Sequence, residues 1–386
     1  MLRIAVVTRY FPSSGEPWQG RSAYKTLREL AGTAKVHVFY PDPNYPSFLS
    51  PRSRIYDKLN PSYRIPGVDV SYVGYPAVPL ISRPLNGRME ASVLLSHVRE
   101  FAPDVILGVF LYPEGYAALK LGKKLGVPVV EMGIGSDIHS IGDRWTAMHT
   151  RKVLREANYL VTVSEDLRQK ALGIGASAQR SCAIVNGCDP AVFHPADRVE
   201  VRHRLGLNVE SPMILYIGRT DLRKGLLELV EAAARLHQRR PEAQVYMVGD
   251  GPDRTQVLNA IEASGAGEYV HPLPACAPDE TALWMAASDL VTLPSYMEGC
   301  PNVVLEALSC GRPVVATRVG GIPEIMSDDC GALIAPHNVP ALEAALDAVL
   351  AKQWDAETIA ARWSRKWSTV AAELNAVLQL VVRSSM

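Results

Sequence analysis

Short runs of aliphatic and β-branched residues recur along the chain, and stretches with helical spacing of apolar positions, such as 94–101 and 117–125, separate them. The runs are continuous rather than alternating between apolar and polar residues, which is typical of strands buried on both faces. Buried strands that alternate with helices predict an α/β fold with parallel sheets between helical layers. In the first half of the chain the runs lie at 4–8, 36–40, 68–73, 105–110, 127–130, 159–163 and 183–185.

A second series of the same kind begins after the turn-rich segment 186–195, with apolar runs at 213–217, 244–248, 290–293 and 314–317. The chain has 386 residues, of which 48% are hydrophobic, and this is more than one core of ordinary size requires. We therefore predict two doubly wound domains, 1–195 and 196–360, followed by a terminal helical segment, 361–386.

The stretch 41–88 interrupts the first series. It is rich in Pro, Tyr and Ser, and between 52 and 88 it carries six basic residues against two acidic ones. We predict a long irregular insert, a feature that is often functional. Two alternatives stay open: the insert contacts an anionic membrane surface, or it is a solvated loop that shapes a pocket.

Charge and cysteine content narrow the function classes. The chain has 40 basic and 40 acidic residues, which argues against a dedicated nucleic-acid-binding protein. Its six cysteines include no Cys-x-x-Cys pair, which favours reduced thiols. Because the first apolar run ends at Arg9, we expect a strand there and no signal peptide. These features predict a cytoplasmic protein, either free or at the inner face of the membrane.

The stretch 295–324 holds the densest set of candidate residues. Glu298 lies in a predicted loop after the run 290–293, and Glu306 lies on the predicted helix that follows, with seven residues between them. Pro301-Asn302 suits a helix start, and Gly311 suits its end. Both carboxylates are therefore expected to reach one crevice at the carboxyl end of a sheet, where open α/β folds bind ligands.

With its continuation Gly311-Arg-Pro-Val-Val and the turn Gly320-Gly-Ile-Pro-Glu324, this stretch resembles the signature of retaining glycosyltransferases of family four, also called glycosyltransferase group 1. The resemblance implies the GT-B fold, in which two Rossmann-like domains face each other across a cleft. It also implies that Glu306 hydrogen-bonds the ribose of a nucleotide-sugar and that Glu298 orients the sugar. Further donor-binding residues that it implies are Gly218, Gly299, Pro301, Asn302 and Val303.

Two basic residues follow the run 213–217. The spacing Gly218-Arg219, four residues, Lys224-Gly225 matches the diphosphate-binding pair of that family. A departing diphosphate gathers negative charge, so positive charge held beside it lowers the barrier. An arginine can fork onto a phosphate and a lysine adds a point charge. The chain contains no Asp-x-Asp pair, and we predict that it requires no metal and no other cofactor.

The first domain is expected to bind the acceptor. Gly20 lies where the family places a glycine-bearing loop over the donor diphosphate, although an ordinary turn glycine is the alternative. The segment 132–138 resembles the acceptor-side loop, but Ile134 occupies the place where many members carry histidine. Ser136, Asp137 and His139 are then the polar candidates. Asp137 either takes part in the reaction or caps the following helix.

The resemblance implies a metal-independent, retaining glycosyltransferase. Its substrates would be a nucleoside-diphosphate-sugar donor and a growing or lipid-linked glycan acceptor, in the synthesis of bacterial surface polysaccharide. One alternative is a non-catalytic nucleotide-sugar-binding subunit, a reading that the missing histidine motivates. A nucleotide-sugar epimerase, which shares this fold, is the other.

Overall fold

The computed structural model describes residues 1–17, 19–45, 60, 62–78 and 81–385. The chain divides into two compact units, one formed by Met1–Asn186 with Trp367–Met386 and the other by Gly187–Lys366. The sequence predicts a first domain that ends at residue 195, whereas the first unit ends at Asn186 and the rest of the turn-rich segment belongs to the second. Of the predicted terminal segment 361–386, the part from Trp367 onward belongs to the first unit.

The first unit is built on a seven-stranded parallel sheet in the order β3-β2-β1-β4-β5-β6-β7. Its strands are β1 (Arg3–Val7), β2 (Lys35–Asn44), β3 (Asp69–Pro76), β4 (Val105–Val109), β5 (Val129–Gly133), β6 (Tyr159–Thr162) and β7 (Ser181–Ala183). Its α-helices are α1 (Arg21–Ala31), α2 (Asn86–Phe101), α3 (Tyr116–Leu125), α4 (Ser136–His139), α5 (Arg144–Glu156), α6 (Glu165–Ile174) and α15 (Trp367–Ser385), with a π-helical turn at Leu111–Gly115 and a 3₁₀ turn at Ala178–Arg180.

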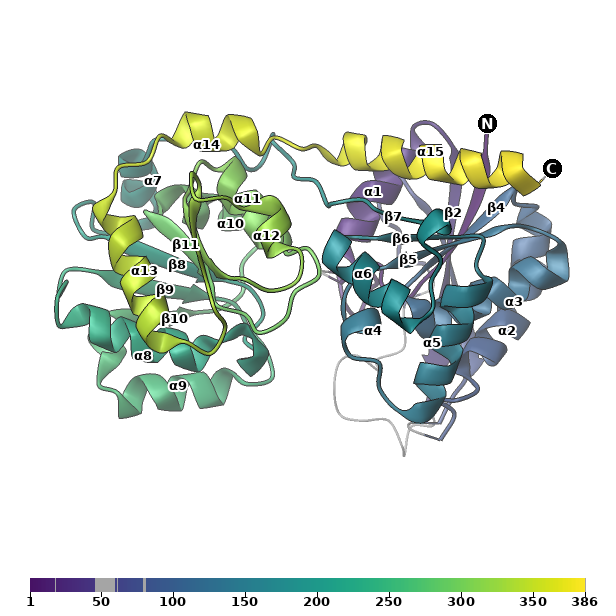
Figure 1. The fold of residues 1–386 in the computed structure, drawn as a ribbon, viewed down its shortest axis with the longest axis horizontal. Helices are drawn as coiled ribbons and strands as arrows, with labels where there is room; N and C mark the ends of the chain where they lie inside the picture. The colour runs from purple at the N-terminus through teal and green to yellow at the C-terminus, as the bar shows by residue number, and fades with distance from the viewer. Residues whose placement is uncertain (18, 46–59, 61, 79–80, 386) are drawn as a thin grey trace. The chain divides into compact units, whose positions relative to one another are not determined.

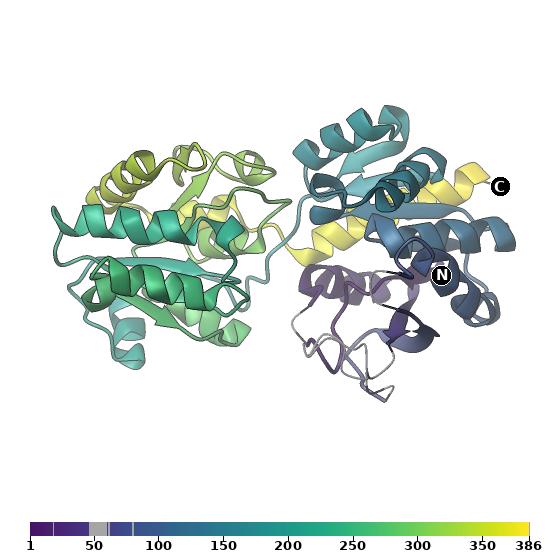
Figure 2. The same cartoon turned by 90° about the horizontal axis from the view of Figure 1, so that it is seen from below.

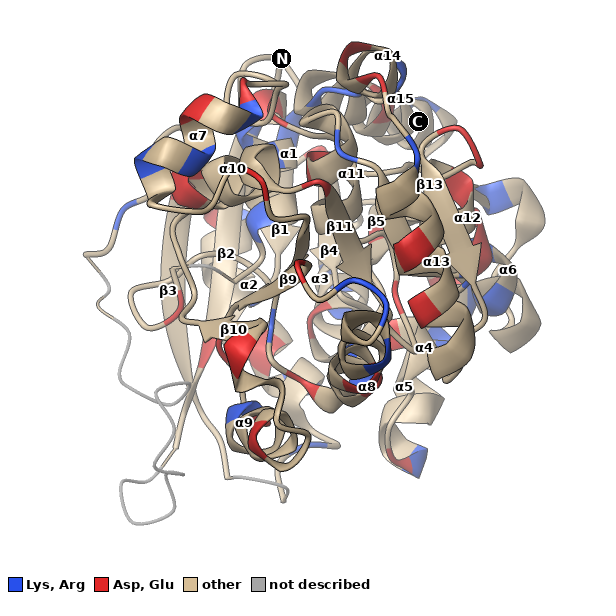
Figure 3. Cartoon of the chain, turned by 90° about the vertical axis from the view of Figure 1, so that its left-hand side faces the viewer, with Lys and Arg blue, Asp and Glu red and all other residues tan. Residues whose placement is uncertain are grey.

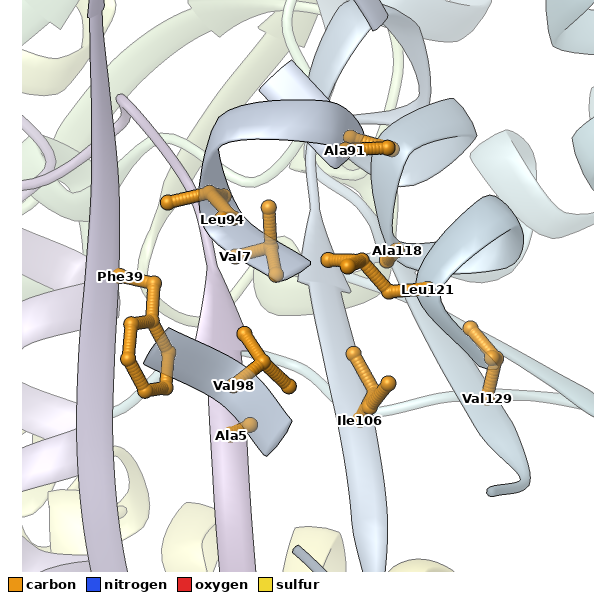
Figure 4. Packing of buried hydrophobic residues seen from close by; sticks show 11 residues of the cluster. Ala5, Val7, Phe39, Ala91, Leu94, Val98, Ile106, Ala118, Leu121 and Val129 are labelled. Carbon is orange, nitrogen blue, oxygen red and sulfur yellow. The ribbon is translucent and has the colours of Figure 1, made fainter. Parts of the chain in front are cut away.

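One face of this sheet is covered by α2 and α3, which pack on each other (Figure 1). Figure 4 shows the resulting core: Val7 and Ile106 from the sheet lie among Leu94 and Val98 of α2 and Leu121 of α3. These side chains are buried, so their apolar area drives the helices onto the sheet. The terminal helix α15 packs on α1.

The stretch 41–88 is less irregular than predicted. Strand β2 continues through Asn44, β3 pairs with it in parallel from His37↔Asp69 to Asn44↔Pro76, and α2 begins at Asn86. The prolines of the stretch misled the prediction. Strand β2 extends past the end of β1, so Pro41 and Pro43 lie in a part of β2 that pairs with β3 alone and needs fewer ladder donors. Its basic residues Arg52, Arg54 and Lys58 lie outside the described residues.

The second unit is built on a six-stranded parallel sheet in the order β10-β9-β8-β11-β12-β13. Its strands are β8 (Met213–Ile217), β9 (Gln244–Val248), β10 (Val270–Leu273), β11 (Leu290–Leu293), β12 (Val314–Thr317) and β13 (Gly331–Ile334). Its α-helices are α7 (Arg198–Leu205), α8 (Leu226–His237), α9 (Arg254–Ala263), α10 (Pro278–Ala287), α11 (Asn302–Ser309), α12 (Ile322–Ile325), α13 (Val339–Ala351) and α14 (Ala356–Arg362), with 3₁₀ turns at Leu222–Lys224 and Ala266–Glu268.

Helices pack in two groups around the second sheet (Figures 1 and 2). Helix α8 packs on α9 and α13, while α10 packs on α7 and α11. The central strands β8, β11 and β12 are wholly buried, as their continuous apolar runs predict, whereas the edge strands β10 and β13 are mostly half-buried. Within the part of the chain that the structure describes, no helix is both long and apolar enough to cross a bilayer.

The two sheets share one topological feature. In each, the chain starts on a central strand, adds strands on one side, and then crosses to the other side of that first strand. The strand order therefore reverses between β1 and β4 in the first unit and between β8 and β11 in the second. Open α/β sheets bind ligands at the carboxyl ends of strands at such switch points.

Candidate functional site

The switch point of the second unit is occupied by an ion pair between two predicted site residues. Lys224, in the turn after β8, donates from Nζ to Oε1 of Glu298, in the loop after β11, at 2.6 Å. The side chain of Glu298 is 9% exposed and that of Lys224 is 27% exposed. A pair sheltered to this degree is screened by salt less than a surface pair. The contact joins the loops that follow two neighbouring strands.

The loop that carries Glu298 rests on the loop after β12. Gly320 has a φ of 54°, and a Cβ atom placed on it would lie 1.8 Å from the carbonyl oxygen of Glu298. The backbone N–H of Gly321 donates to the carbonyl of Gly299 at 2.8 Å. The hydroxyl of Thr317 donates to the carbonyl of Ser295. Only a residue without a side chain allows this close approach, so Gly320 helps to set the position of Glu298.

The other basic residues of the turn after β8 have different surroundings. Arg223 binds Asp221 through two hydrogen bonds, at 2.9 and 2.6 Å, and these bonds hold the pKa of Asp221 down at about 2. Arg219 is exposed at the end of β8, next to the exposed Gly218. The carbonyl of Arg219 accepts a hydrogen bond from the buried hydroxyl of Tyr216 at 2.7 Å. Arg223 is thus engaged within the loop, while the backbone of Arg219 is anchored and its side chain reaches solvent.

Glu306 lies on the first turns of α11, the helix that leaves the Glu298 loop. Pro301 is the N-cap of this helix, which begins at Asn302 with Val303, and Glu306 is half-buried on it. Burial first, and then the charge of Glu306, raises the pKa of Cys188 to about 12. Glu306 therefore lies beside the chain segment that enters the second unit.

The switch point of the first unit holds a cation and two buried acids. Arg9 follows β1, Glu114 follows β4, and Glu90 comes from α2. Tyr75 donates from its hydroxyl to Glu90 at 2.9 Å, and Glu90 is fully buried. Burial raises the pKa of Glu114 to about 7, against the opposing effect of Arg9. Burial and Glu114 also raise the pKa of Glu90. Burial therefore favours the protonated forms of both acids.

Beside the cluster, a cavity of about 230 Å³ lies within the first unit at the carboxyl end of its sheet. Phe110, directly after β4, borders it with a φ of 83°, a left-handed backbone that is rare for an aromatic residue. Most of the other residues that line this cavity carry side chains that can form hydrogen bonds. Its polar lining includes Arg9, Arg83, Asn86, Ser136, Asp137 and Thr150.

Of the site residues that the sequence predicts in the first unit, two lie at this cavity. Ser136 and Asp137 line the cavity. The carboxylate of Asp137 accepts backbone N–H groups of Gly135 at 2.8 Å, Ile134 at 3.1 Å and Leu111 at 3.2 Å, so it ties the loop after β5 to the loop after β4. Gly135, and not Asp137, is the N-cap of α4. Burial raises the pKa of Asp137, and those backbone bonds oppose the rise.

His139 and Gly20 have local structural contacts. The ring of His139 is held against α6, with Nδ1 at 3.1 Å from Lys170 Nζ and Nε2 at 3.9 Å from Asp166. Gly20 is the left-handed N-cap of α1, and a Cβ atom on it would lie 2.2 Å from the carbonyl oxygen of Tyr10. This backbone approach requires glycine at that position whatever ligand binds nearby.

Sequence reasoning singled out Asp137 but missed three other buried acids of the first unit, Glu90, Glu114 and Glu131. Glu131 lies inside β5 and is fully buried, and a Cβ atom on Gly108 or Gly115 would come within 2.3 or 2.4 Å of its carboxylate. Burial raises the pKa of Glu131 well above its ordinary value. The available signals were an acid inside an apolar run, for Glu131, and a cation or acid shortly after such a run, for Arg9 and Glu114.

Two family models match the chain, one in each unit. Residues 19–192 match the model described as Glycosyltransferase Family 4, and residues 197–367 match that of Glycosyl transferases group 1. A relative from Bacillus subtilis (strain 168), described as "Putative teichuronic acid biosynthesis glycosyltransferase TuaC", is 29% identical over 361 residues, which cover 89% of this chain and 88% of the relative.

Solved structures share the fold over the whole chain. Sucrose-phosphate synthase from Thermosynechococcus elongatus superposes with a TM-score of 0.75 at 20% identity, covering 100% of this chain and 97% of that one. Anabaena Alr3699/HepE in complex with UDP has a TM-score of 0.75 at 18% identity, covering 98% and 100%. The two family models together span both units, and the chain is a glycosyltransferase of group 1, family four, with the GT-B fold.

Proposed function

We propose that this glycosyltransferase is a retaining, metal-independent enzyme that takes a sugar from a nucleoside-diphosphate-sugar and transfers it to a growing or lipid-linked glycan. The second unit would bind the donor and the first unit the acceptor. The observation that carries the proposal is the Lys224–Glu298 ion pair at the switch point of the second unit.

The donor diphosphate would lie at the carboxyl ends of β8 and β11. Lys224 has three N–H donors, of which one binds Glu298, so the ammonium is oriented and keeps donors for phosphate oxygens. Arg219 extends from the same turn and is exposed. Two cations that belong to the protein would then offset the charge of the departing diphosphate, the task that a metal ion performs in other enzymes.

The two glutamates would hold the remaining parts of the donor. Glu306, one helix turn inside α11, would accept hydrogen bonds from the ribose hydroxyls. Glu298, held in place by Lys224 and by the approach of Gly320, would orient the transferred sugar. A carboxylate in a sheltered site is a strong acceptor for hydroxyl groups.

The acceptor would bind in the cavity of the first unit. Its lining groups, among them Asn86, Ser136 and Thr150, offer donors and acceptors for glycan hydroxyls, and Arg9 and Arg83 offer charge for an anionic group. The relative named for teichuronic acid biosynthesis supports a surface-polysaccharide acceptor. We place the reaction in the cytoplasm, at the inner face of the membrane, where a lipid-linked acceptor would be found.

In the proposed reaction, the bond from the anomeric carbon to the diphosphate oxygen breaks as the acceptor hydroxyl oxygen bonds to the same face of that carbon. The hydroxyl proton passes to a phosphate oxygen of the departing nucleoside diphosphate. The transition state resembles an oxocarbenium ion, and the configuration at the anomeric carbon is retained.

The test is a turnover assay of the full chain with a panel of nucleoside-diphosphate-sugars and glycan acceptors, in which release of nucleoside diphosphate and the product's anomeric configuration are measured. We expect acceptor-dependent release and a retained configuration. An inverted product would refute the retaining mechanism. Donor binding without transfer or hydrolysis would favour the non-catalytic alternative, and conversion of the free donor without an acceptor would favour the epimerase.

A further inference from the structure

A second cavity lies in the second unit, at the amino ends of its strands, which is the end of the sheet away from the Lys224–Glu298 pair. Its volume is about 550 Å³, which is within the range of small-molecule sites. Pro212, Asp289 and Pro313 line it, and each directly precedes a strand, namely β8, β11 or β12. The donor residues follow those same strands at their other ends. Because β8 is five residues long, the two places lie roughly 15 Å apart along the strands.

The cavity collects more positive than negative charge. Arg198 and Arg202 of α7, Arg312 and Lys352 line it together with the acids Glu210 and Asp289. Figure 3 shows the basic positions along α7. Asp289 is already shared, since both Arg198 and Arg202 bind its carboxylate and the N–H of Met213 donates to it at 2.6 Å. The charge of one acid is thus divided between two cations.

Arg312 is the residue that points to a ligand. It is 9% exposed, and its Nε is buried and has no hydrogen-bond partner among the residues that the structure describes. Its Nη2 donates to the carbonyl of Ala196 at 3.2 Å. Burial first, and then the charge of Arg198, lowers the pKa of Arg312. A buried guanidinium among other cations is costly, and an anion bound where Arg312 lines the cavity offsets that cost.

The other residues that line the cavity indicate the chemistry of the rest of the ligand. The ammonium of Lys352 lies over the ring of Trp354, 3.8 Å from its centroid. The indole N–H of Trp354 donates a hydrogen bond to the carbonyl of Val349. Trp354 therefore offers an apolar wall under a cation. Glu210 and Gln353 add polar groups that can bind hydroxyls. A planar guanidinium matches the oxygens of a phosphate group.

We propose that this cavity binds a small phosphorylated polyol of the size of a sugar phosphate, with its phosphate on Arg312 and Lys352. The site is separate from the donor residues and does not depend on the proposed reaction.

The test is calorimetric titration of the full chain with glucose 6-phosphate, glucose and inorganic phosphate. We expect glucose 6-phosphate to bind best and glucose not to bind. Arg312→Gln should weaken glucose 6-phosphate binding about tenfold or more, because it removes a buried charge-assisted contact. Lys352→Gln, at an exposed position, should weaken it about threefold. Arg235→Gln, which removes an exposed charge of α8, is the matched control and should leave the affinity unchanged.

Lys224→Ala separates this cavity from the donor site. Binding that survives Lys224→Ala and falls in Lys352→Gln supports the cavity. Binding lost in Lys224→Ala would assign the phosphate to the donor side and overturn the proposal. Absence of binding by either phosphate compound, or an unchanged affinity in Lys352→Gln, would overturn it as well, even where Arg312→Gln fails to fold.

Discussion

Replacing Gly320 by alanine tests whether the loop after β12 sets the position of Glu298. Gly320 has a φ of 54°, and the added Cβ would lie 1.8 Å from the carbonyl oxygen of Glu298 and 2.7 Å from its carbonyl carbon. Both atoms are backbone, so no side-chain rotation relieves the contact. The variant must displace one of the two loops by more than 1 Å to restore an ordinary van der Waals distance of about 3.4 Å.

The magnitude has two parts. A left-handed backbone destabilises an alanine by about 1–2 kcal/mol. Alanine also makes the unfolded chain less flexible than glycine does, which offsets this loss by about 0.4–1 kcal/mol. Overpacking adds about 1–3 kcal/mol. We therefore expect Gly320→Ala to lower the free energy of unfolding by about 3 kcal/mol. For a unit of this size, that loss corresponds to a melting temperature about 6–12 °C lower. Displacing Glu298 by about 1 Å should reduce turnover about 100-fold.

Gly265→Ala is the matched control. Gly265 has a φ of 66°, in the same unit, but no atom of the described part of the chain beyond its own neighbours lies within 4 Å of an added Cβ. It should therefore show only the backbone cost, about 1 kcal/mol, with normal turnover. The assays are thermal unfolding of the full chain and release of nucleoside diphosphate at saturating donor. If both variants lose equal stability and Gly320→Ala keeps full turnover, the contact does not set the position of Glu298.

Four further predictions follow from the site. Lys224→Ala should lower turnover at saturating donor by about 100-fold, because a charge beside the departing diphosphate is lost; an active variant would remove Lys224 from the site. Glu306→Ala should weaken donor binding about tenfold in calorimetry with little change in folding, and an unchanged donor affinity would contradict its ribose role. A chelator should leave the turnover rate unchanged, whereas strict dependence on added Mg²⁺ or Mn²⁺ would refute metal independence. Glu114 holds its proton up to a pKa of about 7 in the folded chain, so its contribution to the free energy of unfolding should fall as pH rises from about 4.5 to 7. Glu114→Gln should flatten that fall in urea unfolding curves, and a wild-type slope in the variant would contradict the buried-acid account.

The sequence could predict those features that depend on local pattern. Continuous apolar runs identified strands such as β1, β8 and β11, because a strand buried on both faces needs no distant partner to be recognised. The same holds for the loop with Glu298 and the helix with Glu306, where proline and glycine mark the ends of elements. The pattern failed at 41–88, where the prolines at the end of β2, in the part that pairs with β3 alone, looked like a loop.

What the tertiary structure alone decided is which of these residues meet. Lys224 and Glu298 are 74 positions apart, and they touch because the strand order places β8 next to β11. Arg9 and Glu114 approach each other through the same reversal in the first sheet, and Gly320 reaches Glu298 because β12 is the next strand. Local hydrophobic period records which face of a strand is buried but carries no information on which strand lies beside it, so pairings across the sheet follow only from the packed fold.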